Sequence, residues 1–131
     1  MPLFRRRPPD PALEERRARF GRVASEIDLA QRALLAAIPT SRDAGVPLAQ
    51  ALAEFGARLE AAGSALQDWP AGIRDERWGR CTEALARARG EAERLRLEPG
   101  SLGFEPLNER IGDVLHPLET FADVERELRR L

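Results

Sequence analysis

The residues best suited to metal chemistry lie close together near the C-terminus: Glu109, Asp113, His116 and Glu119. A carboxylate and a histidine three residues apart on a helix can bind one metal ion when both point into the protein interior. Each helical residue turns by about 100°, however, so the first three point roughly 165° to 225° away from the apolar side chains of their own segment. We expect this group to face solvent, and the chain has only one histidine. The sequence therefore predicts neither a metal site nor a haem site.

Motifs for nucleophilic or cofactor chemistry are missing from the sequence as well. No serine stands in a Gly-x-Ser-x-Gly context, and the chain has no Gly-x-Gly-x-x-Gly, no phosphate-loop motif and no lysine for Schiff-base chemistry. Cys81 lies in an apolar stripe, where a thiol is typically a small core residue and not a nucleophile. We therefore expect a protein that is not an enzyme, with no catalytic residues and no cofactor.

The charge balance excludes further classes of protein. Among 131 residues, 21 are basic and 22 are acidic, which gives a formal net charge of -1. A general nucleic-acid binder normally carries a basic excess. All the basic residues are arginine, and the abundance of Arg, Ala, Gly and Pro is typical of a GC-rich genome. The number of arginines is thus weak evidence for function.

The compartment is inferred from cysteine usage and from the N-terminal residues. A single cysteine cannot form an internal disulfide and is compatible with a reducing compartment. No apolar run approaches the ~20 residues of a membrane span. Prolines follow Arg5–Arg7 where a signal peptide would have its apolar core. We expect a cytoplasmic protein, with a flexible Arg/Pro-rich tail over residues 1–9.

The elements that must position these residues are all expected to be helices. Pro and Gly cluster at 8–11, 39–47, 70–72 and 99–106, and the segments between are rich in Ala, Leu, Glu and Arg, without the alternating pattern of strands. The predicted helices cover about 11–38, 47–68, 73–97 and 105–130, the first opening on the capping pair Asp10–Pro11. Pro117 is expected to kink or split the last helix. We predict one all-α domain over 10–131, an antiparallel up-down-up-down four-helix bundle.

Each predicted helix carries an apolar stripe at steps of three and four residues, which defines the core. Small residues form a row beside the second stripe: Ala49, Ala53, Gly56 and Gly63. Because small residues allow close helix packing, we expect this row to face a neighbouring helix of the same fold.

Two connections and one helix face contain apolar residues outside the stripes. The connections 39–46 and 98–104, the second together with the preceding Leu97, carry Val46, Leu97, Leu102 and Phe104, and we expect them to fold over the core. Leu29, Ala33 and Ala36 form a small apolar strip on the outer side of the first helix, a candidate contact for dimerisation.

An antiparallel bundle brings the turn between the second and third helices to the end that holds both chain termini. The candidate interaction surface there consists of Trp69, Arg74, Arg77 and Trp78. One interpretation is a set of solvated helix ends with Trp rings closing the core. The other is a recognition surface, because Trp and Arg are enriched among interface hot spots.

The sequence favours a non-enzymatic module for protein interaction or self-association, with a protein partner or a homodimer. The alternative function is binding of a small apolar ligand between helices near Phe55, Cys81 and Phe121. A weak membrane-surface or nucleic-acid contact through the Arg tail is the third and least favoured option.

Overall fold

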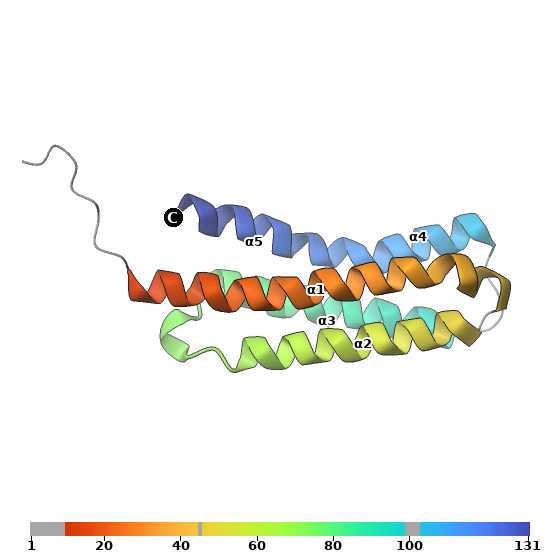
Figure 1. The fold of residues 1–131 in the computed structure, drawn as a ribbon, viewed down its shortest axis with the longest axis horizontal. Coiled ribbons are helices and arrows are strands. Elements are labelled where there is room, and N and C mark those ends of the chain that lie inside the picture. The colour runs from red at the N-terminus through yellow and green to blue at the C-terminus, as the bar shows by residue number, and fades with distance from the viewer. Residues whose placement is uncertain (1–9, 45, 99–102) are drawn as a thin grey trace, which may run out of the picture.

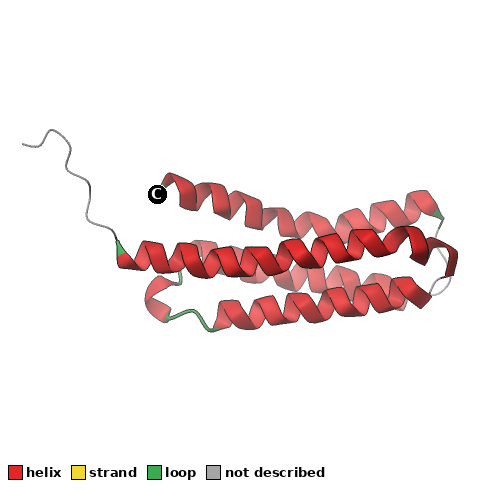
Figure 2. Cartoon of the chain, in the orientation of Figure 1, coloured by secondary structure: helices red, strands yellow, loops and turns green. Residues whose placement is uncertain are grey.

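The computed structural model describes residues 10–44, 46–98 and 103–131, and every regular element in them is helical (Figure 2). The α-helices are α1 (Pro11–Ala44), α2 (Val46–Gln67), α3 (Glu76–Leu97), α4 (Phe104–Leu115) and α5 (Glu119–Arg130). Two short 3-10 segments, η1 (Ala71–Ile73) and η2 (His116–Leu118), lie between them. The prediction of an all-α four-helix bundle is confirmed, while the predicted N-terminal tail lies outside the described residues.

Four long rods lie side by side in the bundle, and α4, η2 and α5 together form the fourth rod (Figure 1). In Figure 1, α1 starts at the end of the bundle where the chain terminates and runs to the far end. Helix α2 runs back to the first end, α3 runs again to the far end, and α4 and α5 lead back to the first end. At the first end, Arg17 near the start of α1 donates to the carbonyl oxygen of Leu128 near the end of α5. We call this the turn end, because it also holds the connection between α2 and α3.

Aspartates mark where two of the helices begin. The carboxylate of Asp10 accepts a hydrogen bond from the backbone N–H of Ala12 at 3.0 Å, which supports the predicted start of α1. Asp75 accepts from the N–H groups of Arg77 and Trp78. Its extended backbone (φ -125°, ψ -168°) makes it the N-cap of α3, so that helix begins three residues after the predicted position.

The predicted end of the first helix at residue 38 is wrong, because α1 continues through Pro39 to Ala44. A proline inside a helix removes the hydrogen bond of its own nitrogen, and the turns on either side can retain theirs. The expected connection over 39–46 is therefore wrong too: only residue 45 separates α1 from α2.

The second predicted cover, over 98–104, is only partly described. Leu97 is 63% exposed, so it does not fold over the core as expected. The side chains of Val46, Leu102 and Phe104 lie outside the described residues.

The chain passes Pro117 through the 3-10 turn η2, which separates α4 from α5. Buried residues continue on both sides of the turn: Leu107, Ile111, Val114, Leu118, Phe121, Val124 and Leu128. The apolar stripe of this segment thus remains directed at the core throughout.

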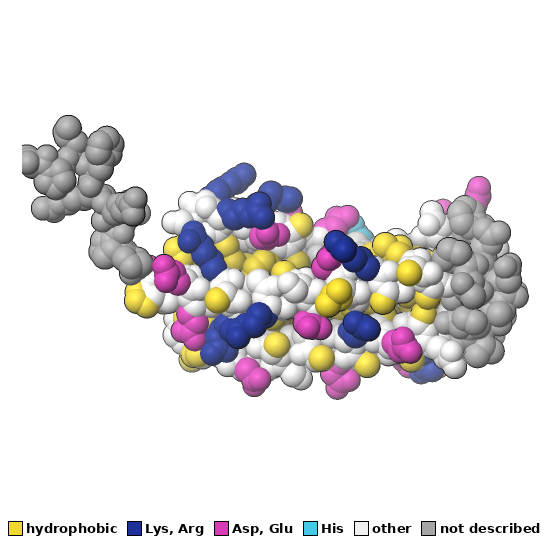
Figure 3. All heavy atoms as spheres, in the orientation of Figure 1, with side chains coloured by type: hydrophobic (Ala, Val, Ile, Leu, Met, Phe, Trp, Pro, Cys, Tyr) yellow, Lys and Arg dark blue, Asp and Glu magenta, His cyan; other side chains and the backbone are white. Residues whose placement is uncertain are grey.

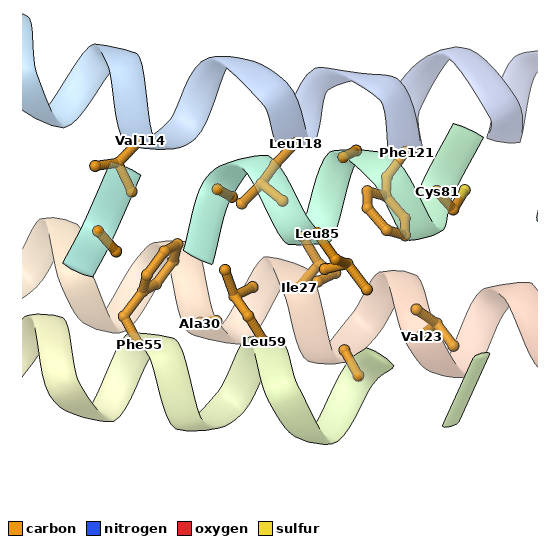
Figure 4. Close-up of a cluster of buried hydrophobic side chains, with 14 of the residues drawn as sticks. Val23, Ile27, Ala30, Phe55, Leu59, Cys81, Leu85, Val114, Leu118 and Phe121 are labelled. Carbon is orange, nitrogen blue, oxygen red and sulfur yellow. The ribbon is translucent and has the colours of Figure 1, made fainter. Parts of the chain in front are cut away.

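The core is aliphatic, with side chains from every rod of the bundle (Figure 4). Leu59 and Leu66 of α2 are fully buried, and Phe20 of α1 stacks on Phe121 of α5 with ring centroids 6.1 Å apart. The predicted stripes of all four segments supply this core.

Charged side chains cover the outer surface. On the face shown in Figure 3, arginine and acidic side chains are interspersed. Many form pairs one helical turn apart, such as Arg19–Glu15 and Arg32–Asp28, which contribute about 0.3–0.5 kcal/mol each. Within the described segments, no helix has the length and apolar character to cross a bilayer.

Candidate functional site

Trp69, the first residue of the predicted interaction surface, is part of the core. Its side chain is 4% exposed and packs in the same buried cluster as Ile73 of η1. The indole nitrogen has no hydrogen-bond partner among the described residues. Trp69 closes the turn end of the bundle and presents little surface to a partner.

Trp78 and Arg74 are brought together by the same turn. The indole Nε1 of Trp78 donates a 2.7 Å hydrogen bond to the carbonyl oxygen of Leu66, at the end of α2. The Arg74 guanidinium lies over the Trp78 ring, 4.6 Å from its centroid. It also donates to the carbonyl oxygens of Trp69, at 2.9 Å, and Gln67. Both side chains therefore donate to carbonyl oxygens at the end of α2 or just beyond it, where the helix supplies no further backbone donors of its own.

Arg77 belongs to an ion-pair network that joins α1, α3 and α5. Its guanidinium lies 3.1 Å from the Asp75 carboxylate and 3.6 Å from that of Glu127. Arg16 of α1 places its Nε 3.4 Å from the Asp75 carboxylate. Arg80 of α3 lies 2.8 Å from the carboxylate of Glu127 on α5. The hydrogen bond with Glu127 raises the pKa of Arg80 above its ordinary value. The network holds the first turn of α3 against its two neighbours.

Further arginines bind backbone carbonyl oxygens at this end. Arg17 donates to Leu128 with both Nε and Nη2, at 3.1 and 2.9 Å. Arg16 donates to the oxygen of Ile73 at 3.0 Å, and Arg19 to that of Asp68 at 3.4 Å. A cation near a helix C-terminus can donate hydrogen bonds to the last carbonyl oxygens, and its charge interacts favourably with the negative end of the helix dipole. The guanidinium groups that suggested a recognition surface thus make hydrogen bonds within the chain.

The acidic residues and the histidine of the last segment lie on the surface. Glu109, Asp113, His116 and Glu119 are all exposed, as their helical phase predicts. His116 Nδ1 lies 3.2 Å from a carboxylate oxygen of Glu119. Over the described ranges, no three His, Cys, Asp or Glu side chains are grouped closely enough to hold a metal ion.

Cys81 is a buried thiol, 1% exposed. Desolvation raises its pKa from 9.0 to about 12, and the positive charge of Arg80 only partly opposes this effect. At neutral pH the side chain is therefore protonated, and a protonated thiol is a poor nucleophile.

The place proposed for an apolar ligand is filled by side chains. Phe55, Cys81 and Phe121 are buried in the core, where Figure 4 shows them among leucine, isoleucine and valine side chains. Phe121 already stacks on Phe20. None of these three side chains lines the surface hollows between α2 and α3, beside α3 and Pro117, or between α1 and the end of α2.

The largest of these hollows is a groove that follows the outer side of α2 and α3. Two adjoining hollows of about 610 and 440 Å³ form it, and they share Glu60, Ala86 and Arg89. Small side chains form about half of its lining: Ala53, Gly56, Ala57, Gly63 and Ser64 of α2, with Thr82, Ala86, Gly90 and Ala92 of α3. We call this feature the small-residue groove. Glu60 and Arg89 form an ion pair across it, 3.8 Å apart.

The prediction that the small row of the second segment faces a helix of the same fold holds at Gly63, beside Leu85 of α3, and not at Ala53 and Gly56. Ala53 is exposed, and a Cβ added at Gly56 would meet nothing within 4 Å. A Cβ added at Gly63 would make only an ordinary contact, 3.9 Å from Leu85. Large residues of the stripe, such as Leu52 and Leu59, fill the core side of α2. Ala53 and Gly56 lie beside them and open outwards.

Sequence reasoning missed the α3 half of the groove. Its signal was available, since Thr82, Ala86 and Gly90 follow one another at steps of four beside the buried stripe of Cys81 and Leu85. The strip proposed on α1 is exposed, with Leu29 at 52%.

Comparison with protein-family models, curated proteins and solved structures found no match to this chain.

Proposed function

We propose that the protein is a non-enzymatic helical bundle that acts as a protein-interaction or self-association module, with the small-residue groove as its contact face. The observation that supports this proposal is an open groove, with small residues as about half of its lining, that runs along two adjacent helices. Its shape suits an α-helix, because small side chains allow a third helix to pack closely in the groove between two others.

The glycines of the groove add a physical argument. A glycine in a helix interior lowers stability by about 1 kcal/mol relative to alanine. Packing within the bundle does not require glycine at 56, where an added Cβ meets open space. Close approach of an external helix would make use of the missing side chain.

The turn end is less suited to a partner than the groove, because most of its arginine side chains are already bound within the chain. Its guanidinium groups bind Ile73, Trp69 and Leu128 carbonyl oxygens of the same chain, and Trp69 is buried. A partner at that end would have to compete with these bonds. At the groove, Glu60 and Arg89 are exposed and only 3.8 Å apart, so a partner displaces little.

The proposal places the module in the cytoplasm. Its single cysteine is buried and free, so the fold needs no disulfide and is suited to a reducing compartment.

The test introduces bulk and charge at the groove. Ala86→Glu changes an exposed residue of the groove, and Ala122→Glu is its matched control at an exposed position of α5. Tagged chains are expressed in the source cells, and the size of the native complex is measured by gel filtration of the extract. Wild type and Ala122→Glu should elute above the monomer mass, and Ala86→Glu should elute as the monomer. Identical elution of both variants in the larger complex contradicts the proposal.

A further inference from the structure

We infer that a hollow between α1 and the end of α2 binds a small α-amino acid with an apolar side chain. The hollow has a volume of about 290 Å³, close to the lower limit of about 300 Å³ for ligand pockets. Its lining comes from α1 and from the end of α2 with the turn after it: Arg19, Arg22, Val23, Ala65, Asp68 and Trp69. We call it the α1–α2 hollow. The inference does not rest on the small-residue groove, although Asp68 borders both features.

Two opposite charges line the α1–α2 hollow without pairing. Arg16, Arg17 and Arg19 of α1 all donate hydrogen bonds within the chain. The guanidinium of Arg22 differs from them, because it has no ion pair or hydrogen bond with any described residue. The carboxylate of Asp68 is likewise unpaired within the described ranges, so the two charged groups do not reach each other. A molecule that carries both a negative and a positive group can pair with each of them.

The indole of Trp69 is an independent sign of a bound molecule. Trp69 lines the hollow and is 4% exposed, yet its Nε1–H has no acceptor in the described part of the chain. Buried N–H groups are nearly always hydrogen-bonded in native proteins, and an exception points to a water, ion or ligand bound beside it. Trp78 shows the ordinary arrangement, since its Nε1–H donates to the carbonyl oxygen of Leu66 at 2.7 Å. A ligand carboxylate in the hollow is an acceptor of the kind that Trp69 lacks.

The lining fits an α-amino acid better than a simple anion. A carboxylate suits the free guanidinium of Arg22, which can bind it with two parallel hydrogen bonds. Asp68 repels a ligand that is only negative, and it attracts the ammonium group of an amino acid. Val23, Ala65 and the Trp69 ring form the apolar part of the lining and suit an aliphatic side chain. Because Arg22 and Asp68 are exposed, a ligand of about nine heavy atoms should bind weakly, with a Kd of about 0.1–1 mM.

The test is a titration of the purified full chain with L-leucine, followed by the indole N–H signals in heteronuclear NMR spectra. The chain has two tryptophans, and the variant Trp78→Phe assigns their signals. The Trp69 signal should shift with a Kd of about 0.1–1 mM. The Trp78 signal should stay in place, because its N–H is already bound to Leu66. A Trp69 signal that does not move up to about 10 mM L-leucine, at least tenfold above the expected Kd, overturns the inference.

Two analogues and two pairs of variants test the need for both charges. N-acetyl-L-leucine lacks the positive charge and L-leucinamide lacks the negative one, and each should bind at least about 10-fold more weakly than L-leucine. Arg22→Gln and Asp68→Asn should each weaken binding of L-leucine to a similar extent. Their matched controls, Arg58→Gln and Asp113→Asn, change exposed residues outside the hollow and should leave the Kd unchanged. An analogue that binds as tightly as L-leucine overturns the inference, as does normal binding by Arg22→Gln or Asp68→Asn.

Discussion

Replacing Arg74 with methionine tests whether the turn end is a structural element of the bundle. Methionine keeps an unbranched apolar stem and removes the guanidinium. The variant loses two hydrogen bonds to the carbonyl oxygens of Trp69 and Gln67, together with the stacking on Trp78. Because Arg74 is exposed, water replaces part of the loss. We assign about 0.5–1 kcal/mol to each hydrogen bond and about 0.5 kcal/mol to the cation–π contact.

These contributions give a predicted destabilisation of about 1.5–2.5 kcal/mol. At about 2.1 cal/mol/K per residue, the unfolding entropy of the 131-residue chain is about 0.28 kcal/mol/K, so Tm should fall by about 5–9 °C. Thermal and urea unfolding followed by circular dichroism measure the change, and the urea m-value should stay constant. The matched control is Arg87→Met, because Arg87 is 71% exposed and pairs only loosely with Glu83 at 3.5 Å.

The control should lower Tm by less than about 2 °C, as expected for an exposed ion pair. If Arg74→Met is no less stable than Arg87→Met, the hydrogen bonds at the turn end do not stabilise the bundle. Arg74 would then be free to contact a partner, as the recognition interpretation requires.

Three further predictions concern the caps, the buried thiol and the groove. Asp75→Ala should destabilise the fold by about 1–2 kcal/mol and Asp10→Ala by less, because only Asp75 also pairs with Arg16 and Arg77; equal urea midpoints for the two variants would contradict this reasoning. The pKa of the Cys81 thiol is about 12 in the fold, against an ordinary value of 9.0, so its contribution to stability is complete below pH 9.0 and declines as pH rises towards about 12. The urea midpoint of wild type should therefore fall between pH 8 and pH 10 by more than that of Cys81→Ala, and an equal fall in both proteins would refute the pKa shift. Gly56→Ala should raise stability by about 0.5–1 kcal/mol in dilute protein, since the added methyl group meets no atom within 4 Å; a lower urea midpoint would show that the site is tighter than the structure indicates.

The sequence predicts the helices and their buried faces well because both depend on local spacing. Leu59, Leu85 and Phe121 are buried as their stripes predict. Helix ends were less predictable where one residue type allows two outcomes. Pro39 was expected to end a helix and lies inside α1, whereas the capping preference of Asp10 gave the correct start.

The partners of the turn-end arginines and the openness of the groove could not be read from sequence, for two physical reasons. The partners of the arginines are distant carbonyl oxygens: Arg16 binds Ile73, 57 positions away, and Arg17 binds Leu128, 111 positions away. Every residue has such an oxygen, so no residue type marks the partner. The groove depends on how far large core residues hold α2 from α3, and this separation decides whether Gly56 is covered or open.

The central claim, that the small-residue groove is the contact face, is tested most directly by photo-crosslinking in the source cells. A photoreactive phenylalanine replaces Ala86 in the groove, Ala33 in the α1 strip, or Ala122 on α5 as the control; all three positions are exposed. We predict a protein adduct at position 86 alone, with a mass above that of one chain. Adducts at position 33 or 122 but none at position 86 would contradict the claim.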